Sequence, residues 1–340
     1  MKFKIKLLNF IILVSGIAFN HHNAIAQDKT GYHKIKSLSL KSPGGWDYLL
    51  AVPELNRLYV SHGNQVNIFS LKTGDSTGII SNTQGVHGIA VVLALNKGYI
   101  SNGKTNTASV FDLRTNAVIG TIPCGSNPDA IFYDDFSKKI YTCNGKSENA
   151  TVIDVVTDKV VGTIPLGAKP ETAVSDGKGK IFVNGETTNE VIVIDAKTYK
   201  VVARYKIKSG EEPTGLDIDR KTNRLFIACG GTKTMVIMDA ANGDNLAKFP
   251  IGDSDGLVFD PALKLAFASN GGGTISVVRE INADQFKLIE SIPSEKSART
   301  ITIDLKSHHL YLSAAKTVAN PAGGYPKMVP GTFHVLEIGK

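Results

Sequence analysis

Short apolar runs alternate with polar turns along most of the chain, and the same order of runs returns about every 42 residues. Each copy contains four apolar runs, and the second of them begins with an aromatic residue. This aromatic position marks seven copies: Tyr59, Tyr99, Tyr141, Phe182, Phe226, Phe267 and Tyr311. Several short strands in a repeat of this length are typical of the blades of a β-propeller.

The second copy shows the expected strands most clearly, at 88–92, 98–101, 108–113 and 118–122. In four copies the third strand ends in an aspartate: Asp112, Asp154, Asp195 and Asp239. An aspartate there can accept hydrogen bonds from backbone amides two residues later and start a hairpin turn. We therefore assign these repeated acids to structure.

The seventh copy predicts how the ring closes. It has strands near 299–304, 309–313 and 332–338 but lacks a fourth strand, whereas residues 34–40 alternate like the closing strands of other copies. Pairing this N-terminal strand with the last blade would cover an exposed edge. The sequence thus predicts an all-β, seven-bladed propeller with four-stranded antiparallel blades, and deleting residues 32–43 should abolish stable folding.

Residues 1–26 have the features of a cleaved signal peptide. A lysine-rich start is followed by a short apolar stretch and by Ala24-Ile25-Ala26, the small-x-small pattern of a cleavage site. We expect residues 27–340 to form one domain outside the cytoplasm, periplasmic or secreted. No later segment is long and apolar enough to cross a membrane.

Charge and cysteine content exclude some classes of function. The net charge is +7, and removing three lysines with residues 1–26 leaves +4, with the charges scattered. A nucleic-acid partner is therefore not expected. The cysteines are Cys124, Cys143 and Cys229. A bridge between Cys124 and Cys143 is geometrically conceivable, but we favour small buried hydrophobic residues.

The candidate site comes from the register of the repeat. Counting back 12 residues from each aromatic marker, or 11 in the fourth copy, reaches a mostly polar set: Asp47, His87, Asp129, Glu171, Thr214, Asp255 and Arg299. In a propeller these positions enter the inner strands and encircle one mouth of the central channel. Converging polar groups in a concave site indicate ligand binding.

Three uses of this ring remain open. Clustered carboxylates repel one another unless a cation neutralises them, and oxygen-rich sites suit Ca²⁺, Mg²⁺ or Mn²⁺, with Asp129, Glu171 and Asp255 as candidate ligands. The ring could equally hold a small organic ligand, with Arg299 binding its acidic group. Alternatively, it only lines a water-filled channel, with Arg299 paired to an acid across it.

Two further features lie at the same end. Asn102, Asn144 and Asn270 share one register with His62, and since a glycine follows each asparagine we assign them to turns. Residues 314–331 form an unusually long connection in the last blade. Long loops in compact domains are often functional or mobile, so this one is interpreted either as a lid over the channel or as a surface excursion.

The repeats resemble the YVTN β-propeller family, and in particular its YncE-like exported proteins. The resemblance rests on Leu58-Tyr59-Val60-Ser61, Ser109-Val110-Phe111-Asp112 and Thr151-Val152-Ile153-Asp154, together with Gly162-Thr163-Ile164-Pro165. It implies a seven-bladed propeller outside the cytoplasm but transfers no activity by residue. Our functional prediction is an exported binding module that holds a small ligand or hard cation at the channel mouth. The alternatives are a metal-assisted hydrolase or lyase with His87 as general base, and a scaffold for a protein partner.

Overall fold

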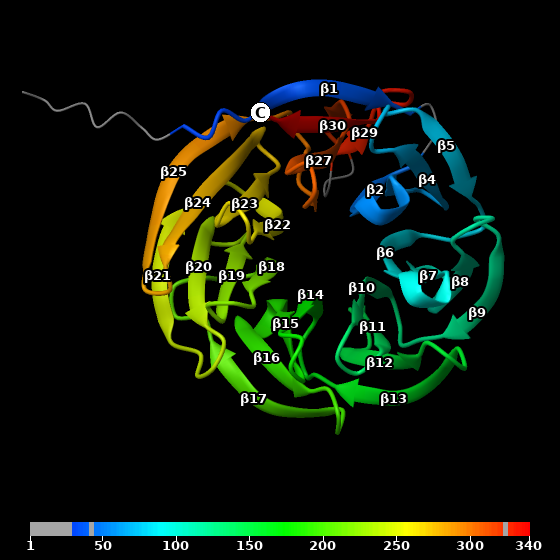
Figure 1. Ribbon diagram of the computed structural model, residues 1–340, viewed down its shortest axis with the longest axis horizontal. Coiled ribbons are helices and arrows are strands. Elements are labelled where there is room, and N and C mark those ends of the chain that lie inside the picture. The colour runs from blue at the N-terminus through cyan, green and yellow to red at the C-terminus, as the bar shows by residue number, and fades with distance from the viewer. Residues whose placement is uncertain (1–28, 41–43, 322–325) are drawn as a thin grey trace, which may run out of the picture.

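The computed structural model describes residues 29–40, 44–321 and 326–340. Within these ranges the chain forms seven four-stranded antiparallel sheets, arranged as a ring around a central axis (Figure 1). The predicted seven-bladed β-propeller is confirmed. The predicted signal peptide, residues 1–26, lies outside the described residues.

The first three blades follow the repeat directly, from the inner to the outer strand. Blade 1 comprises β2 (Trp46–Val52), β3 (Arg57–His62), β4 (Gln65–Ser70) and β5 (Ser76–Ile80). Blade 2 comprises β6 (Val86–Val92), β7 (Lys97–Asn102), β8 (Thr107–Asp112) and β9 (Val118–Pro123). Blade 3 comprises β10 (Pro128–Asp134), β11 (Lys139–Asn144), β12 (Asn149–Asp154) and β13 (Lys159–Pro165).

The next three blades repeat the same order. Blade 4 comprises β14 (Pro170–Ser175), β15 (Lys180–Gly185), β16 (Glu190–Asp195) and β17 (Lys200–Lys206). Blade 5 comprises β18 (Pro213–Asp219), β19 (Arg224–Cys229), β20 (Thr234–Asp239) and β21 (Asn245–Pro250). Blade 6 comprises β22 (Ser254–Asp260), β23 (Leu265–Asn270), β24 (Thr274–Asn282) and β25 (Gln285–Pro293). The helical elements of the described ranges are three short 3₁₀ turns, η1 (Pro53–Leu55), η2 (Leu93–Leu95) and η3 (Glu186–Thr188).

Blade 7 joins the two ends of the chain. It comprises β26 (Ile301–Asp304), β27 (His309–Ala314), β30 (His334–Gly339) and, as its outer strand, β1 (His33–Ser39). β1 runs antiparallel to β30, with Leu38 opposite Val335, and Figure 1 shows it outside β30. The predicted closure by the N-terminal strand is confirmed, and it covers the edge of β30.

The aromatic markers hold the blades together. All seven are 0–1% exposed, because the strands that carry them are covered on both faces by neighbouring blades. Tyr59 of blade 1, for example, packs in one apolar cluster with Ile89 and Ile100 of blade 2. A corresponding cluster joins Tyr311 of blade 7 to Leu58 of blade 1. Burial of these large side chains is the main stabilising contribution across each blade boundary.

The aspartates that end the third strands act as predicted. Asp154 Oδ1 accepts hydrogen bonds from the backbone amides of Val156 and Thr157, at 3.0 and 2.9 Å. The same arrangement recurs in the other three copies, at Asp112, Asp195 and Asp239. These acids therefore satisfy turn amides.

The assignment of Asn102, Asn144 and Asn270 to turns is wrong. They end β7, β11 and β23, and none of the three adopts the positive φ that the prediction required. Their side chains are buried and donate to the neighbouring third strand, as Asn102 Nδ2 does to Ser109 Oγ at 2.9 Å. His62, in the same register, lies at the end of β3, its ring stacked on Phe333.

The three cysteines are free thiols, and Cys143 and Cys229 are fully buried. A bridge from Cys124 to Cys143 does not form. In the part of the chain that the structure describes, no helix has the length and apolar character needed to cross a bilayer.

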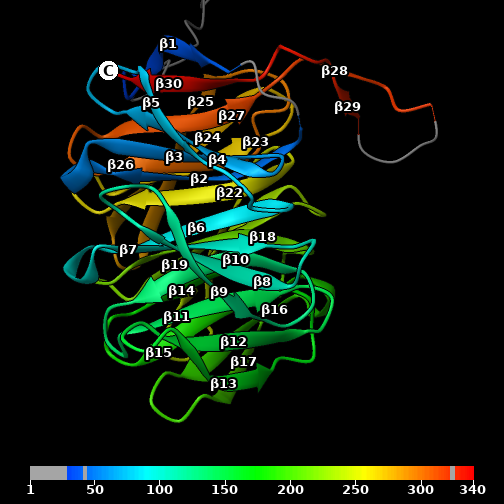
Figure 2. The same cartoon turned by 90° about the vertical axis from the view of Figure 1, so that its right-hand side faces the viewer.

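The long connection of blade 7 contains a small hairpin, β28 (Thr317–Val318) paired with β29 (Lys327–Met328). Figure 2 shows this hairpin extending outward from one face of the propeller. It lies at the end of the ring that carries Arg299, because Met328 and Pro330 line a cavity with that residue. The central residues of the predicted lid segment, 322–325, lie outside the described ranges.

Candidate functional site

The structure brings all seven ring residues together. They line one cavity of about 500 Å³ at the mouth of the central channel, to which Tyr48, Lys169, Glu186, Glu212 and Asp253 also contribute. The positions come from seven different blades, so the cavity exists only because the ring closes. Its volume lies in the range of small-molecule sites.

A local irregularity of the inner strand exposes the ring residues to the channel. In blade 1, Trp46 pairs with His62 but the next pair is Leu49 with Val60, so Asp47 lies in an unpaired step. The same shift in register occurs at the start of the inner strand in blades 2 to 6. Such bulges redirect a side chain and commonly occur beside functional sites.

Polar residues of the second strand hold these irregular steps in place. Ser101 Oγ donates to the carbonyl of Asp129 in the next blade and accepts from Gly88 N at 2.8 Å. In the same register, Asn184 donates to the carbonyl of Thr214, and Ser269 to the carbonyl of Arg299. Each donor therefore fixes the backbone of a ring residue on the following blade. Their signal in the sequence was a polar residue two positions after the aromatic marker.

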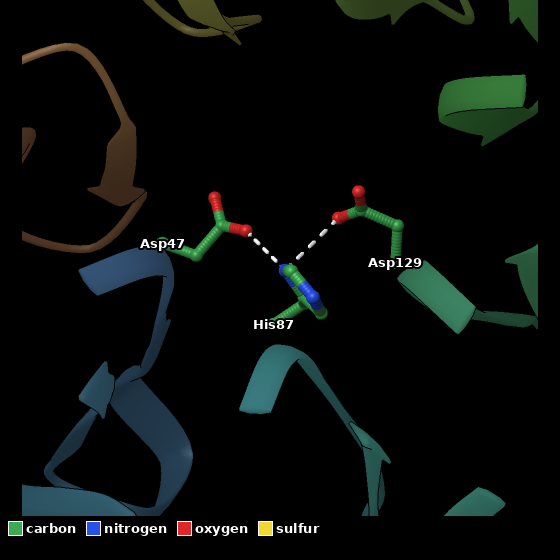
Figure 3. Close-up of side chains that lie close together, drawn as sticks. All are labelled: Asp47, His87 and Asp129. Carbon is green, nitrogen blue, oxygen red and sulfur yellow. Dashed lines mark hydrogen bonds and ion pairs between the residues drawn. The ribbon is translucent and has the colours of Figure 1, made fainter. Parts of the chain in front are cut away.

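Asp47, His87 and Asp129 form the tightest group of the ring, and Figure 3 shows both carboxylates pointing at the imidazole. His87 Nδ1 lies 2.6 Å from Asp47 Oδ2 and 3.5 Å from Asp129 Oδ1. One ligand atom from each of the three residues lies within 4.8 Å of the others, a spacing that a metal ion could bridge. The group comes from blades 1, 2 and 3.

The carboxylates control the charge of His87. Burial by itself lowers the pKa of the imidazole, but the hydrogen bond to Asp47 and the charges of Asp129, Asp47 and Glu171 outweigh it and raise the pKa to about 9. His87 is therefore protonated at neutral pH and acts as an internal cation for the two aspartates. Burial, followed by the charge of Asp47, raises the pKa of the Asp129 carboxyl above its usual range.

A second ion-pair group lies on blade 4. Lys169 Nζ is 2.6 Å from Glu171 Oε1 and also contacts the carboxylate of Glu186. Glu171 is only 8% exposed, and this burial, together with the charge of Asp129, raises its pKa. Burial lowers the pKa of Lys169, but the two glutamates outweigh it and keep the pKa above the usual range. The acid predicted as a metal ligand thus has a lysine partner.

Arg299 is held by the blades on either side of it. Its guanidinium pairs with Asp255 of blade 6, and Nη2 lies 4.0 Å from Asp47 Oδ1 of blade 1. The acid partner is therefore a neighbour rather than a residue across the channel. Asp255 and Glu171 pair with Arg299 and Lys169, whereas Asp47, His87 and Asp129 gather around one point. Of the predicted metal ligands Asp129, Glu171 and Asp255, Asp129 belongs to this group.

Tyr48 lines the cavity next to the ring residue Asp47. It belongs to blade 1, yet it packs against the apolar cluster of blades 3 and 4 that contains Ala130 and Ala173. Burial, followed by the charges of Asp129, Glu171 and Asp47, raises its pKa well above the usual value. The Thr214 hydroxyl, in contrast, donates to the backbone oxygen of Ser254 at 2.7 Å, so its proton is already used in a hydrogen bond.

Sequence reasoning missed Lys169, Tyr48, Glu186 and Asp253, which flank the ring positions or lie on neighbouring loops. Asp253 and Tyr48 are within two residues of a ring position, so widening the register would have found them. Glu186 has no such signal, because it lies on η3, which occupies the loop between the second and third strands of blade 4.

The cavity is strongly acidic on a chain with a net positive charge. Seven carboxylates line it (Asp47, Asp129, Glu171, Glu186, Glu212, Asp253 and Asp255), against Lys169, Arg299 and protonated His87. Whole-chain charge and site charge therefore have opposite signs. Such a concave, carboxylate-lined site attracts cations.

The chain matches no family model. Over 142 residues, 41% of its length, it is 24% identical to "Uncharacterized protein YncE" of Salmonella typhimurium (strain LT2). This match spans 39% of the length of that relative. With the seven blades, it supports a YncE-like propeller.

Solved propellers share the fold at low sequence identity. A chain of Kuenenia stuttgartiensis hydrazine synthase aligns with a TM-score of 0.70 at 16% identity, over 80% of this chain and 94% of that one. U3-55K gives 0.74 at 10% identity over 89% and 98%, and the RRP9 WD40 repeats give 0.75 at 10% identity over 90% and 97%. These likenesses show the architecture alone.

Proposed function

We propose that this YncE-like propeller is an exported binding module that holds a small cationic ligand or a hard divalent cation at the channel mouth. The observation that carries the proposal is the Asp47–His87–Asp129 group inside a cavity lined by seven carboxylates. Tyr48 also lines this cavity and packs against the apolar cluster of blades 3 and 4, so an aromatic ring borders the carboxylates.

The electrostatics favour an incoming positive charge. Burial and mutual repulsion raise the pKa values of Asp129 and Glu171, which means that the unneutralised carboxylates are destabilised. A cation that replaces the proton on His87 would neutralise the same oxygens with more charge. We infer that ligand binding relieves repulsion that the closed ring creates.

The donor atoms of this group limit which cations it could bind. Two carboxylates and one imidazole nitrogen combine the oxygen ligands preferred by Ca²⁺, Mg²⁺ and Mn²⁺ with a nitrogen that suits transition metals. Mn²⁺ is compatible with both, so it is the first probe. An organic amine is the alternative occupant, because an ammonium group can donate to several carboxylates at once.

Titration calorimetry tests the proposal with Mn²⁺, Ca²⁺ and Mg²⁺ on the chelator-treated protein. We expect one Mn²⁺ per chain, and Asp47→Asn should weaken its binding by about tenfold or more, since one charged ligand is lost. Asp135→Asn is the matched control, because Asp135 pairs with Arg220 on the exposed surface away from the mouth.

Unchanged affinity in Asp47→Asn would refute the metal site. If none of the three ions binds, a screen of small amines with the same variants decides between an organic cation and no cation at all. Failure of both would leave the scaffold function, in which a protein partner contacts the propeller faces.

The protonation state of His87 disfavours a role as general base. At neutral pH the imidazole carries a proton that it donates to Asp47. It therefore lacks the lone pair that a general base needs. The metal-assisted hydrolase or lyase remains the weaker hypothesis for this site.

Export is part of the proposal and is tested separately. We expect the mature protein recovered from the periplasm or medium to begin at Gln27. Mass spectrometry of the intact protein reads this directly, and a mature chain that retains residues 1–26 would contradict it.

A further inference from the structure

A second cavity lies beside the channel mouth, against the long connection of blade 7. Its volume is about 750 Å³. One wall is formed by the chain entering β2, from Gly44 to Trp46, and the opposite wall by the β28–β29 hairpin and the residues after it. It shares only Gly271 and Arg299 with the acidic cavity.

The walls of this second cavity are apolar. Trp46 packs on Phe333, with ring centroids 5.6 Å apart, and both belong to the buried contact between blades 7 and 1. Facing it are Pro326, Met328 and Pro330 from the hairpin side. A rigid indole opposite a flexible methionine can accept flat or irregular apolar groups.

The charges at its rim are all positive. Lys296, Lys327 and Arg299 line the cavity, and none of the lining residues that the structure describes is acidic. Both lysines are exposed, and neither forms an ion pair with another residue in the described ranges. The second cavity therefore has the opposite charge preference from the channel mouth.

We propose that this cavity binds a small apolar molecule that carries a carboxylate or sulfonate group. Its ring or chain lies between Trp46 and Met328, and its anion is held by Lys296 and Lys327, with Arg299 at the inner end. This goes beyond the channel-mouth function, since it concerns a different cavity and a ligand of opposite charge. Its volume is suited to a molecule of this kind.

Two fluorescent probes with the same apolar body test the proposal: anilinonaphthalene sulfonate, which is anionic, and phenylnaphthylamine, which is neutral. We expect saturable binding of the sulfonate at one site per chain and weaker binding of the neutral probe. Met328→Ser should weaken sulfonate binding about three- to tenfold through lost apolar contact. Lys296→Gln combined with Lys327→Gln should weaken it by a similar factor through lost charge.

Lys316→Gln is the matched control, because Lys316 is exposed on the same connection but does not line the cavity. It should leave the affinity unchanged. Equal affinity for the two probes, or sulfonate binding that survives both Met328→Ser and the double lysine variant, would overturn the proposal. Asp47→Asn should not weaken sulfonate binding, so failure of this site and failure of the cation site are separate results.

Discussion

His87 Nδ1 lies 2.6 Å from Oδ2 of Asp47, although the two residues belong to neighbouring blades and are 40 residues apart in the chain. This ion pair connects blade 1 to blade 2 at the channel mouth. It also determines which side of the imidazole carries the shared proton.

The first prediction concerns stability against pH. The pKa of His87 rises from 6.5 to about 9 on folding, so its stabilisation is fully present below pH 6.5 and is lost as the pH rises through 9. We expect His87→Asn to destabilise the protein at pH 6 by about 3 kcal/mol more than at pH 10. Urea unfolding of the wild type and variant at both pH values measures this difference.

The control for this measurement is His33→Asn, at an exposed histidine on β1. It should change the free energy of unfolding little at either pH. A cost of His87→Asn that is equal at pH 6 and pH 10 would show that the pair with Asp47 does not hold the proton.

The second prediction rests on the proposed cation site. Mn²⁺ must displace the proton of His87, so its affinity should rise by up to about tenfold per pH unit between pH 7 and 9. Calorimetry in buffers of different ionisation enthalpy should detect about one proton released per ion bound. His87→Asn should bind more weakly and without this pH dependence; a steep dependence that persists would place the proton elsewhere.

The third prediction concerns the packing of Tyr48 beside the acidic cavity. Tyr48 fills space between blade 1 and the cluster that contains Ala130 and Ala173. We expect Tyr48→Ala to lower the free energy of unfolding by about 3–5 kcal/mol, because the channel cannot collapse around the void. Tyr48→Phe keeps the ring and its packing and should cost only about 1 kcal/mol. Similar losses in both variants would mean that the hydroxyl, not the packing, matters.

The fourth prediction tests ring closure with a pair of residues on one strand. Leu38 of β1 is 6% exposed and packs in the cluster between blades 7 and 1, whereas Ile35 on the same strand is 41% exposed. Leu38→Ser should lower the free energy of unfolding by about 2–4 kcal/mol. Ile35→Ser should stay within about 1 kcal/mol. Thermal and urea unfolding of both variants give the comparison, and equal effects would argue against closure through Leu38.

The fold could be predicted from the sequence because each blade carries the same local pattern of apolar and polar residues. Tyr59, Tyr99 and their equivalents recur at the second strand, and each is buried between blades. The ring positions followed from the same spacing. Asn102 shows the limit of this reasoning: an Asn-Gly pair favours a turn locally, yet the side chain is drawn into the blade to donate to Ser109.

The ion-pair partners of the site residues could not be predicted from the sequence. Lys169 pairs with Glu171 and Arg299 pairs with Asp255, so two of the three candidate metal ligands have basic partners. Which acid pairs with which base depends on loop paths and side-chain directions. Neither the loop paths nor the side-chain directions follow from the period of the repeat.

The sequence alone determined the number of blades, their register and the residues that reach the channel mouth, since strand alternation and burial act over a few neighbouring residues. The tertiary structure decided that Asp47, His87 and Asp129 meet, that Tyr48 packs against blades 3 and 4, and that an apolar cavity lies beside Arg299. These outcomes depend on contacts between blades that are far apart in the chain. Such contacts form only when the ring closes. Only then do the charged groups come close enough to form ion pairs.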